Sequence, residues 1–322
     1  MAIFGKTTPA REPPFACHAI LTGTMDIAFL TENFAIPGVL SFHKTESGFV
    51  YADVVTPEAT AKIYLQGAQL AAWQPAGHDP VLFFSSHESF TPGHAMRGGV
   101  PICFPWFGAR HDGKAGPAHG FARTQEWELA FAAVAGDDLH LTFTLGPTEV
   151  SRGLGYDNFR LVYELVIGRT LTMRLTAANN GAEPLVIEEA LHTYFAVGDV
   201  REVKLTGLEP TAYGDKTDDM REKPAAHEPV TFTGETDRVY DNTAATCVIH
   251  DAAGRRRISV AKQNSHTTVV WNPWKEMADL GAEEWPKMLC VETANTAENA
   301  ITLAQGQAHT MQAQVSVEEV EG

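Results

Sequence analysis

Apolar and polar residues alternate with a period of two along much of this chain. Residues 139–145 read LHLTFTL, residues 161–167 read LVYELVI, residues 171–175 read LTMRL, and residues 311–317 read MQAQVSV. Successive side chains of a β-strand point to opposite faces of the sheet, so this period places one face in a core and the other in solvent. These stretches therefore predict half-buried strands.

Turn residues, rather than helices, separate these strands. Gly136-Asp137-Asp138 and Asn180-Gly181 are typical of turns. A period of 3.6 is not sustained anywhere, and the best candidate for a short helix is residues 275–284. The acidic, polar stretch 214–236 predicts a long loop of the kind that often carries function. Strands that follow strands predict an all-β chain with few short helices, folded as an antiparallel sandwich or barrel.

The domain organisation is simple. The chain has 322 residues and contains neither an internal repeat nor a composition typical of an interdomain linker. Residues 1–30 follow no structural pattern, and we expect an N-terminal extension that is poorly ordered. Residues 31–322 are expected to form a single domain, which is long enough to bury a substantial core.

Charge excludes several classes of partner. The formal net charge is -16, which opposes binding to nucleic acid or to an anionic membrane. The sequence has no apolar run of about 20 residues and no signal-peptide pattern, so we expect a cytoplasmic protein. A phosphorylated substrate would have to be attracted by a few locally placed arginines, since the chain as a whole repels it.

Polar and aromatic residues concentrate in four short segments. These are MRGGVPICFPWFG at 96–108, HGFAR at 119–123, ALHTYF at 190–195, and LCVETAN at 289–295 with VWNPW upstream at 270–274. The adjacent glycines of the first segment allow a backbone to approach a ligand closely, although an ordinary turn uses the same pair. The tryptophans have core packing as their alternative.

His192 and Glu292 differ in what they indicate when taken singly. A lone histidine in an apolar stretch such as 190–195 is more often a core residue than a catalyst. Glu292 ends the apolar run 288–291, which predicts a buried strand. A buried carboxylate needs either a partner or a chemical task.

A metal site is not expected. Glu189 and His192 have the Glu-x-x-His spacing of carboxylate-bridged metal sites, but that geometry requires a helix and a second copy of the motif. In a strand the two side chains point to opposite faces. The four cysteines, Cys17, Cys103, Cys247 and Cys290, form no Cys-x-x-Cys pair. Cys103 and Cys290 have apolar neighbours and are interpreted as small buried hydrophobic residues, with a catalytic thiol as the alternative.

Taken in order, these motifs resemble the aldose 1-epimerase superfamily, and specifically its glucose-6-phosphate 1-epimerase (hexose-6-phosphate mutarotase) branch. The resemblance spans residues 35 to 317 and rests on RGGVPICFPWFG at 97–108, HGFAR at 119–123, ALHTYF at 190–195, YGDKT at 213–217, VVWNPW at 269–274 and CVETAN at 290–295. It implies a large antiparallel β-sandwich of the galactose mutarotase-like type. It also implies a small-molecule sugar phosphate as the partner, with no cofactor, in a monomer or weak homodimer.

The resemblance also implies roles for individual residues. His192 is expected as the general acid and Glu292 as the general base. The substrate-binding residues implied are Arg97 and Arg123 for the phosphate, His119 and Asp215 for sugar hydroxyls or the ring oxygen, and Trp274 for the face of the sugar. The family pattern has a glutamine just before HGFAR where this chain has Ala118. That difference removes a polar contact and leaves the preferred sugar open.

These residue types suit anomer interconversion, because an acid and a base that work in both directions are all the reaction requires. Other functions stay open from the sequence: an aldose 1-epimerase acting on free sugars, a sugar-phosphate-binding protein without catalysis, or a glycoside-processing enzyme. The last ranks lowest because such enzymes normally use two carboxylates, and only Glu292 is persuasive here.

Overall fold

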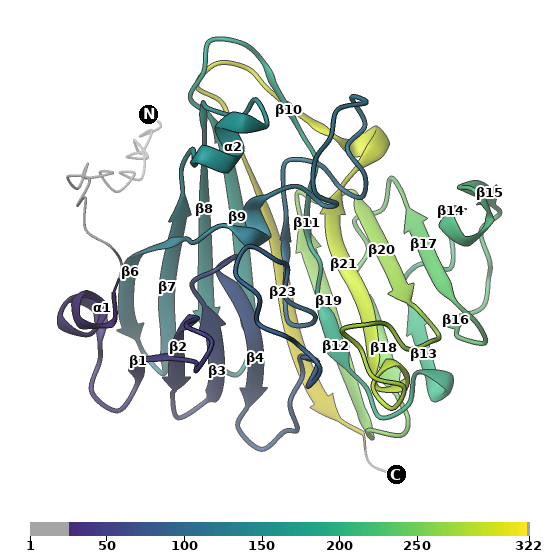
Figure 1. Ribbon diagram of the computed structural model, residues 1–322. Coiled ribbons are helices and arrows are strands. Elements are labelled where there is room, and N and C mark those ends of the chain that lie inside the picture. The colour runs from purple at the N-terminus through teal and green to yellow at the C-terminus, as the bar shows by residue number, and fades with distance from the viewer. Residues whose placement is uncertain (1–25, 321–322) are drawn as a thin grey trace, which may run out of the picture.

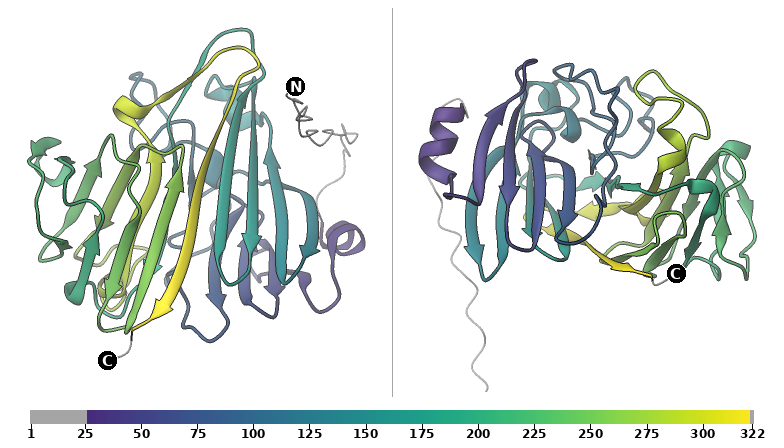
Figure 2. Two further views of the ribbon diagram at one scale, coloured as in Figure 1. Left: turned by 180° about the vertical axis from the view of Figure 1, so that it is seen from behind. Right: turned by 90° about the horizontal axis from the view of Figure 1, so that it is seen from below.

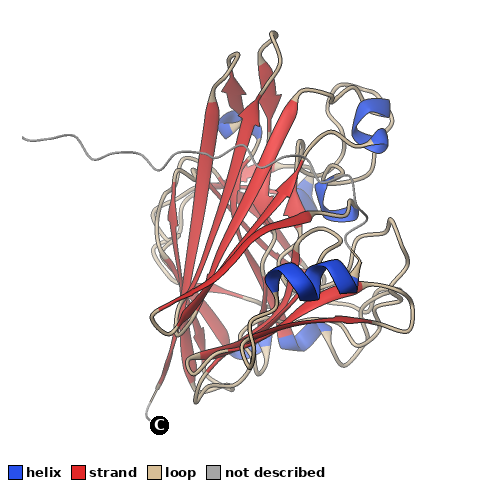
Figure 3. Cartoon of the chain, turned by 90° about the vertical axis from the view of Figure 1, so that its left-hand side faces the viewer, coloured by secondary structure: helices blue, strands red, loops and turns tan. Residues whose placement is uncertain are grey.

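The computed structural model describes residues 26–320, and strands are the main secondary structure of that part of the chain (Figure 1). All of the named strand pairs are antiparallel. Seen from the side, the strands lie in two layers (Figure 3). The predicted antiparallel β-sandwich is therefore confirmed.

The fold contains three large sheets and one separate pair of strands. The largest has nine strands in the order β16 (Val230–Thr231), β13 (Val203–Thr206), β18 (Cys247–Asp251), β19 (Arg256–Gln263), β23 (Ala308–Glu319), β9 (Leu171–Asn179), β8 (Phe159–Ile167), β7 (Asp138–Leu145) and β6 (Glu128–Ala135). A four-stranded sheet has the order β1 (Leu40–Lys44), β2 (Val50–Val55), β3 (Ala59–Tyr64) and β4 (Gln69–Pro75). β10 (Leu185–Ile187) pairs with β22 (Ile301–Leu303).

The eight-stranded sheet holds most of the motifs singled out in the sequence. Its order is β15 (Arg221–Lys223), β14 (Tyr213–Asp215), β17 (Thr236–Tyr240), β20 (Thr267–Asn272), β21 (Met288–Asn295), β11 (Glu189–Leu191) and β5 (Ile102–Cys103), and β12 (Tyr194–Ala196) also pairs with β21. Figure 2 shows this sheet beside the other half of the molecule, viewed from behind and from below.

Helices are few and short. They are α1 (Ile27–Phe34), α2 (Glu149–Gly153) and the single-turn 3₁₀ helices η1 (Ala122–Thr124), η2 (Val200–Glu202), η3 (Lys216–Asp218), η4 (Trp285–Lys287) and η5 (Ala297–Asn299). None of the helices between residues 26 and 320 is long and apolar enough to cross a membrane. α1 begins at the capping residue Asp26, whose side chain accepts a hydrogen bond from the backbone N–H of Phe29.

The N-terminal extension predicted for residues 1–30 lies mostly outside the described residues. α1 runs across the predicted boundary, and Leu30 is completely buried. α1 packs beside β1. Residue 30 is therefore part of the packed structure.

Alternating burial follows the sequence pattern closely. Every second residue of β7 and of β8 is buried. The buried side chains of the nine-stranded and four-stranded sheets join those of β20 and β21 in one large hydrophobic core. The period of two therefore determined which side of each strand faces that core.

Two local predictions are wrong. Residues 275–284 form no helix; they make a loop in which Met277 and Leu280 exchange backbone hydrogen bonds, and the short helix η4 begins only at Trp285. The stretch 214–236 is not a plain loop, since it contains η3, β15 and β16 and parts of β14 and β17. Strands of two or three residues are too short to show an alternation that sequence can reveal.

Candidate active site

The centre of the candidate site is β21, which is buried along its whole length. Leu289 and Val291 belong to the main core, whereas Cys290 and Ala294 belong to smaller apolar clusters on the opposite face. Glu292 shares this second face, and only 1% of its surface is exposed. The predicted buried strand is confirmed, but it continues to Asn295, so Glu292 lies inside the strand and not at its end.

His192 lies between β11 and β12, at the position that faces Glu292 on β21. Leu191 is opposite Thr293 and Tyr194 is opposite Cys290, so the same register places residue 192 opposite residue 292. The Nε2 atom of His192 is 3.4 Å from Oε1 of Glu292. The Nδ1 atom of His192 and Oε2 of Glu292 are buried and have no hydrogen-bond partner in the described structure. This buried pair thus has two polar atoms without a partner among the described residues.

Aromatic rings hold His192 in place. Its backbone N–H donates to the carbonyl of Pro101, and its ring stacks on Tyr194 with centroids 4.9 Å apart. Trp271 and His119 present their rings edge-on to it, at 6.2 Å and 5.5 Å between centroids. His192 is thus a buried residue, as its sequence context suggests, but its ring is aimed at a carboxylate.

His119 lies close to the pair and has a defined tautomer. Its Nδ1 accepts a hydrogen bond from the backbone N–H of Gly108 at 3.3 Å, so the ring proton is on Nε2. Burial, together with the nearby charges of Arg123 and Lys216, lowers the pKa of His119 to about 3. At neutral pH this residue is therefore an uncharged hydrogen-bond donor.

Arg97 reaches the same face of the sheet through Tyr194. Its Nη1 donates to the Tyr194 hydroxyl at 2.9 Å, and its Nη2 lies 3.0 Å from Oδ2 of Asp279. The guanidinium also lies 5.8 Å from the centroid of the Trp271 ring. The two glycines that follow it have positive φ, and a Cβ at Gly99 would lie 2.2 Å from the carbonyl oxygen of Leu70. These glycines permit close packing of backbone on backbone, which is the ordinary structural use of such a pair.

Arg123 is held by the residue that departs from the family pattern. Its Nη2 donates to the backbone carbonyl of Ala118 at 2.8 Å, and its Nε is buried without a partner among the described residues. Its charge acts on both His192 and Glu292. This contact uses the backbone carbonyl of Ala118 and not its side chain.

The other two predicted binding residues, Asp215 and Trp274, are held by their own neighbours. The Asp215 carboxylate accepts hydrogen bonds from the backbone N–H and the hydroxyl of Thr217, and Asp215 thereby caps the N-terminus of η3. Burial raises the pKa of Asp237, and the charge of Asp215 also raises it. Trp274 packs on Trp285, with ring centroids 4.9 Å apart. The tryptophan that contacts His192 is Trp271.

Sequence reasoning missed Lys216 and Asp237. The Nζ atom of Lys216 is 3.5 Å from Oδ1 of Asp237 and 4.7 Å from the centroid of the Phe107 ring. Asp237 on β17 is opposite Trp271 on β20, and Trp271 is opposite Cys290 on β21. Cys290 lies two residues before Glu292 on β21, so Asp237 belongs to the same face of the sheet as Glu292. Lys216 lies inside the YGDKT motif, and this motif could have identified it as a candidate site residue. Asp237 belongs to no motif, and only strand pairing brings it to the site.

Burial acts on the two members of the pair in opposite directions. It lowers the pKa of His192 well below its ordinary value, and the neighbouring His119, Arg123 and Arg97 lower it further. It raises the pKa of Glu292 well above its ordinary value, against the opposing effect of Lys216. Both directions favour a pair that carries one proton and no net charge.

The Glu-x-x-His spacing does not form a metal site. Glu189 accepts a hydrogen bond from Asn295 and lies 3.2 Å from His309, while His192 faces Glu292. Strand alternation separates the two residues, as the sequence predicts. Within residues 26–320, no group of three or more His, Cys, Asp and Glu side chains is arranged to hold a metal ion.

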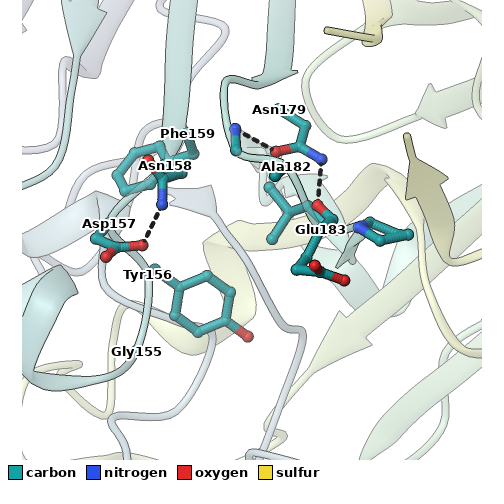
Figure 4. Close-up of a pocket in the computed structure, with 11 residues that line it drawn as sticks. Gly155, Tyr156, Asp157, Asn158, Phe159, Asn179, Ala182 and Glu183 are labelled. Carbon is teal, nitrogen blue, oxygen red and sulfur yellow. Dashed lines mark hydrogen bonds between the residues drawn. The ribbon is translucent and has the colours of Figure 1, made fainter. Parts of the chain in front are cut away.

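Two surface cavities lie outside this constellation. One of about 350 Å³ lies between the segments 155–159 and 179–185 (Figure 4). The amide side chains that line this cavity donate hydrogen bonds to other residues of its lining: Asn158 donates to Asp157, and Asn179 donates to the carbonyl of Glu183. The other, of about 470 Å³, is lined by Trp106, Glu188 and their neighbours. No predicted site residue lines either cavity.

Comparison with known proteins points to one family. A sequence profile described as aldose 1-epimerase matches residues 54–316. A protein of Escherichia coli K12 named "Putative glucose-6-phosphate 1-epimerase" is 37% identical over 261 residues, which is 80% of this chain and 86% of that protein. A protein of the same name from the plant Cenchrus ciliaris is 32% identical over 260 residues, covering 77% of this chain and 78% of that protein.

Solved structures agree with this likeness. The crystal structure of a "putative mutarotase" from Salmonella typhimurium has a TM-score of 0.83 and 33% identity, and covers 89% of this chain and 96% of that one. The structure of galactose 1-epimerase from Lactobacillus acidophilus has a TM-score of 0.67 at 14% identity, covering 88% and 99% of the two chains. The second likeness concerns the fold alone.

Proposed function

This chain belongs to the aldose 1-epimerase family, and from that premise we propose that it interconverts the α and β anomers of a hexose 6-phosphate, with D-glucose 6-phosphate as the first candidate. The observation that carries the proposal is the buried His192–Glu292 pair with three cationic side chains around it. In a chain with a formal net charge of -16, Arg97, Arg123 and Lys216 converge on one face of one sheet. Arg97 and Lys216 are paired with Asp279 and Asp237, whereas Arg123 has no carboxylate partner among the described residues, and its charge suits an anionic substrate.

The pair supplies the acid and the base. Glu292 takes the proton from the anomeric hydroxyl while His192 gives its proton to the ring oxygen. The C1–O5 bond breaks, and the ring opens to an aldehyde with a hydroxyl at C5. Rotation about C1–C2 then presents the other face of the carbonyl. Reclosure returns the proton from the C5 hydroxyl to His192 and the proton on Glu292 to the new anomeric oxygen.

The pair carries one proton and no net charge throughout the cycle, which is the charge state that burial favours. The lowered pKa of His192 and the raised pKa of Glu292 favour this proton on Glu292 in the resting pair, so it must move to His192 before the ring opens as proposed. Since the reaction runs in both directions, each residue must both give and accept a proton with similar ease. The positive charges of Lys216 and Arg123 assist the ionised form of Glu292.

Phosphate recognition falls to the arginines in this proposal. A guanidinium stays charged and can donate two parallel hydrogen bonds to a phosphate. Arg97 and Arg123 each have a buried Nε atom without a partner in the described structure. We assign His119 to a sugar oxygen as a neutral donor, and Trp271, rather than Trp274, to the apolar face of the sugar.

An anomerisation assay tests the proposal. Exchange between anomers is followed by NMR with catalytic amounts of the protein, using glucose 6-phosphate and free glucose in parallel. We expect preference for the phosphate ester, and we expect Arg97→Ala to raise KM for the ester far more than KM for free glucose. Arg169→Ala is the control, because that arginine is exposed and pairs with Glu58.

The same assay separates the alternatives. Faster exchange of free glucose or galactose than of the phosphate ester would identify an aldose 1-epimerase for unphosphorylated sugars. Binding of glucose 6-phosphate without any acceleration of exchange would identify a non-catalytic binding protein.

A further inference from the structure

Arg97 already has an anionic partner in this structure. Its Nη2 lies 3.0 Å from Oδ2 of Asp279, and its Nη1 donates to the hydroxyl of Tyr194 at 2.9 Å. Asp279 belongs to the loop 275–284, which follows β20. A phosphate that binds Arg97 must therefore either share the guanidinium with the Asp279 carboxylate or displace that carboxylate.

We propose that Asp279 is a specificity-determining residue: its carboxylate occupies Arg97 when no phosphate is bound and leaves when the phosphate of the substrate arrives. This inference rests on the function proposed above, and it adds a second state of Arg97 to it. Free sugars leave the Arg97–Asp279 pair intact. A sugar phosphate exchanges it for a stronger pair.

The exchange needs only a side-chain rotation, because the backbone of the loop is anchored on both sides of Asp279. Met277 and Leu280 exchange two backbone hydrogen bonds, and Leu280 is completely buried. The Glu284 carboxylate accepts hydrogen bonds from the Ser85 hydroxyl at 2.6 Å, from the backbone N–H of Ser86 at 2.7 Å and from that of Gly281 at 2.9 Å. The side chain of Asp279, by contrast, is 37% exposed.

Charge decides which anion replaces Asp279. A phosphate ester carries about -1.5 to -2 charges at neutral pH and offers three acceptor oxygens, whereas a carboxylate carries one charge and offers two. A second carboxylate would gain little by the exchange, but a phosphate gains both charge and hydrogen bonds. If Asp279 stayed in place, its charge would repel the incoming phosphate. The pair therefore weakens phosphate binding somewhat and excludes weaker anions from Arg97.

Asp279→Asn is the test, with Glu283→Gln as the matched control. Both substitutions remove one negative charge from the same loop, but Glu283 pairs with the exposed His87 and is itself 65% exposed. We expect Asp279→Asn to lower KM for glucose 6-phosphate about 2–5-fold, the scale of a partly exposed ion pair. Inhibition by inorganic phosphate should strengthen by a similar factor. Glu283→Gln should keep the wild-type values, which excludes a general effect of charge.

The double variant Arg97→Ala/Asp279→Asn completes the experiment. If Asp279 acts through Arg97, the gain from Asp279→Asn disappears when Arg97 is absent. An unchanged or raised KM for Asp279→Asn, in a protein whose preference for the phosphate ester is lost in Arg97→Ala, would overturn the role of Asp279 and leave the proposed function standing. A wild-type protein with no preference for the ester and no inhibition by inorganic phosphate would overturn both.

Discussion

His192, between β11 and β12, faces Glu292 on β21, with Nε2 of the histidine 3.4 Å from Oε1 of the glutamate. Both are buried, and each retains one polar atom without a partner in the described structure. The acid–base role proposed for the pair can be tested separately from phosphate recognition.

Removing either member of the pair should abolish most of the turnover. A positioned acid or base contributes about 10²–10⁴-fold, so His192→Gln and Glu292→Gln should each raise the barrier by roughly 3–5 kcal/mol. Anomer exchange by NMR measures the loss as a fall in kcat. Wild-type kcat in either variant would contradict the assignment, provided that thermal unfolding shows the variant to be folded.

The rate should stay level over a wide range of pH. The doubly protonated pair carries a net positive charge and the fully deprotonated pair a net negative charge, and burial opposes both. Low pH is therefore resisted by the lowered pKa of His192, and high pH by the raised pKa of Glu292. We expect the pH profile of kcat/KM to extend beyond the window of about two units between unperturbed Glu and His. A narrow maximum near pH 5.5 with little activity at pH 7.5 would contradict this.

Lys216 and Asp237 should move the alkaline limb of that profile in opposite directions. Lys216 favours the ionised form of Glu292 and Asp237 disfavours it. Lys216→Met should therefore shift the limb to higher pH and Asp237→Asn should shift it to lower pH. Lys223→Met is the matched control, because Lys223 pairs with Asp218 instead. Shifts of the same sign in both variants would show that neither charge acts on Glu292.

Glu292 should cost stability at neutral pH. Its pKa in the folded protein lies above that of the unfolded chain, so its contribution to stability is present at acid pH and is lost as the pH rises. Glu292→Gln should therefore raise Tm more at pH 8 than at pH 5, by about 2–4 °C for each kcal/mol gained. Glu298→Gln, at an exposed position, is the comparison. Equal changes in Tm at both pH values would contradict the expectation.

The strands were predictable because their signal is local. The alternation in residues 139–145 and 161–167 appears directly as β7 and β8. The helix predicted for residues 275–284 was wrong because polar side chains of this segment make contacts far away in the chain, Asp279 with Arg97 and Glu284 with Ser85. Such contacts have no periodic trace in the sequence.

The site was predictable only as a set of residue types in motifs. The sequence by itself determined the strands, the acidic charge of the chain and the presence of a histidine and a glutamate in suitable segments. Tertiary structure decided that His192 faces Glu292, that Trp271 rather than Trp274 lies beside them, and that Asp237 reaches the site. The physical reason is that strand register and burial depend on partners far away in the chain, and these two properties place the side chains and shift their pKa values.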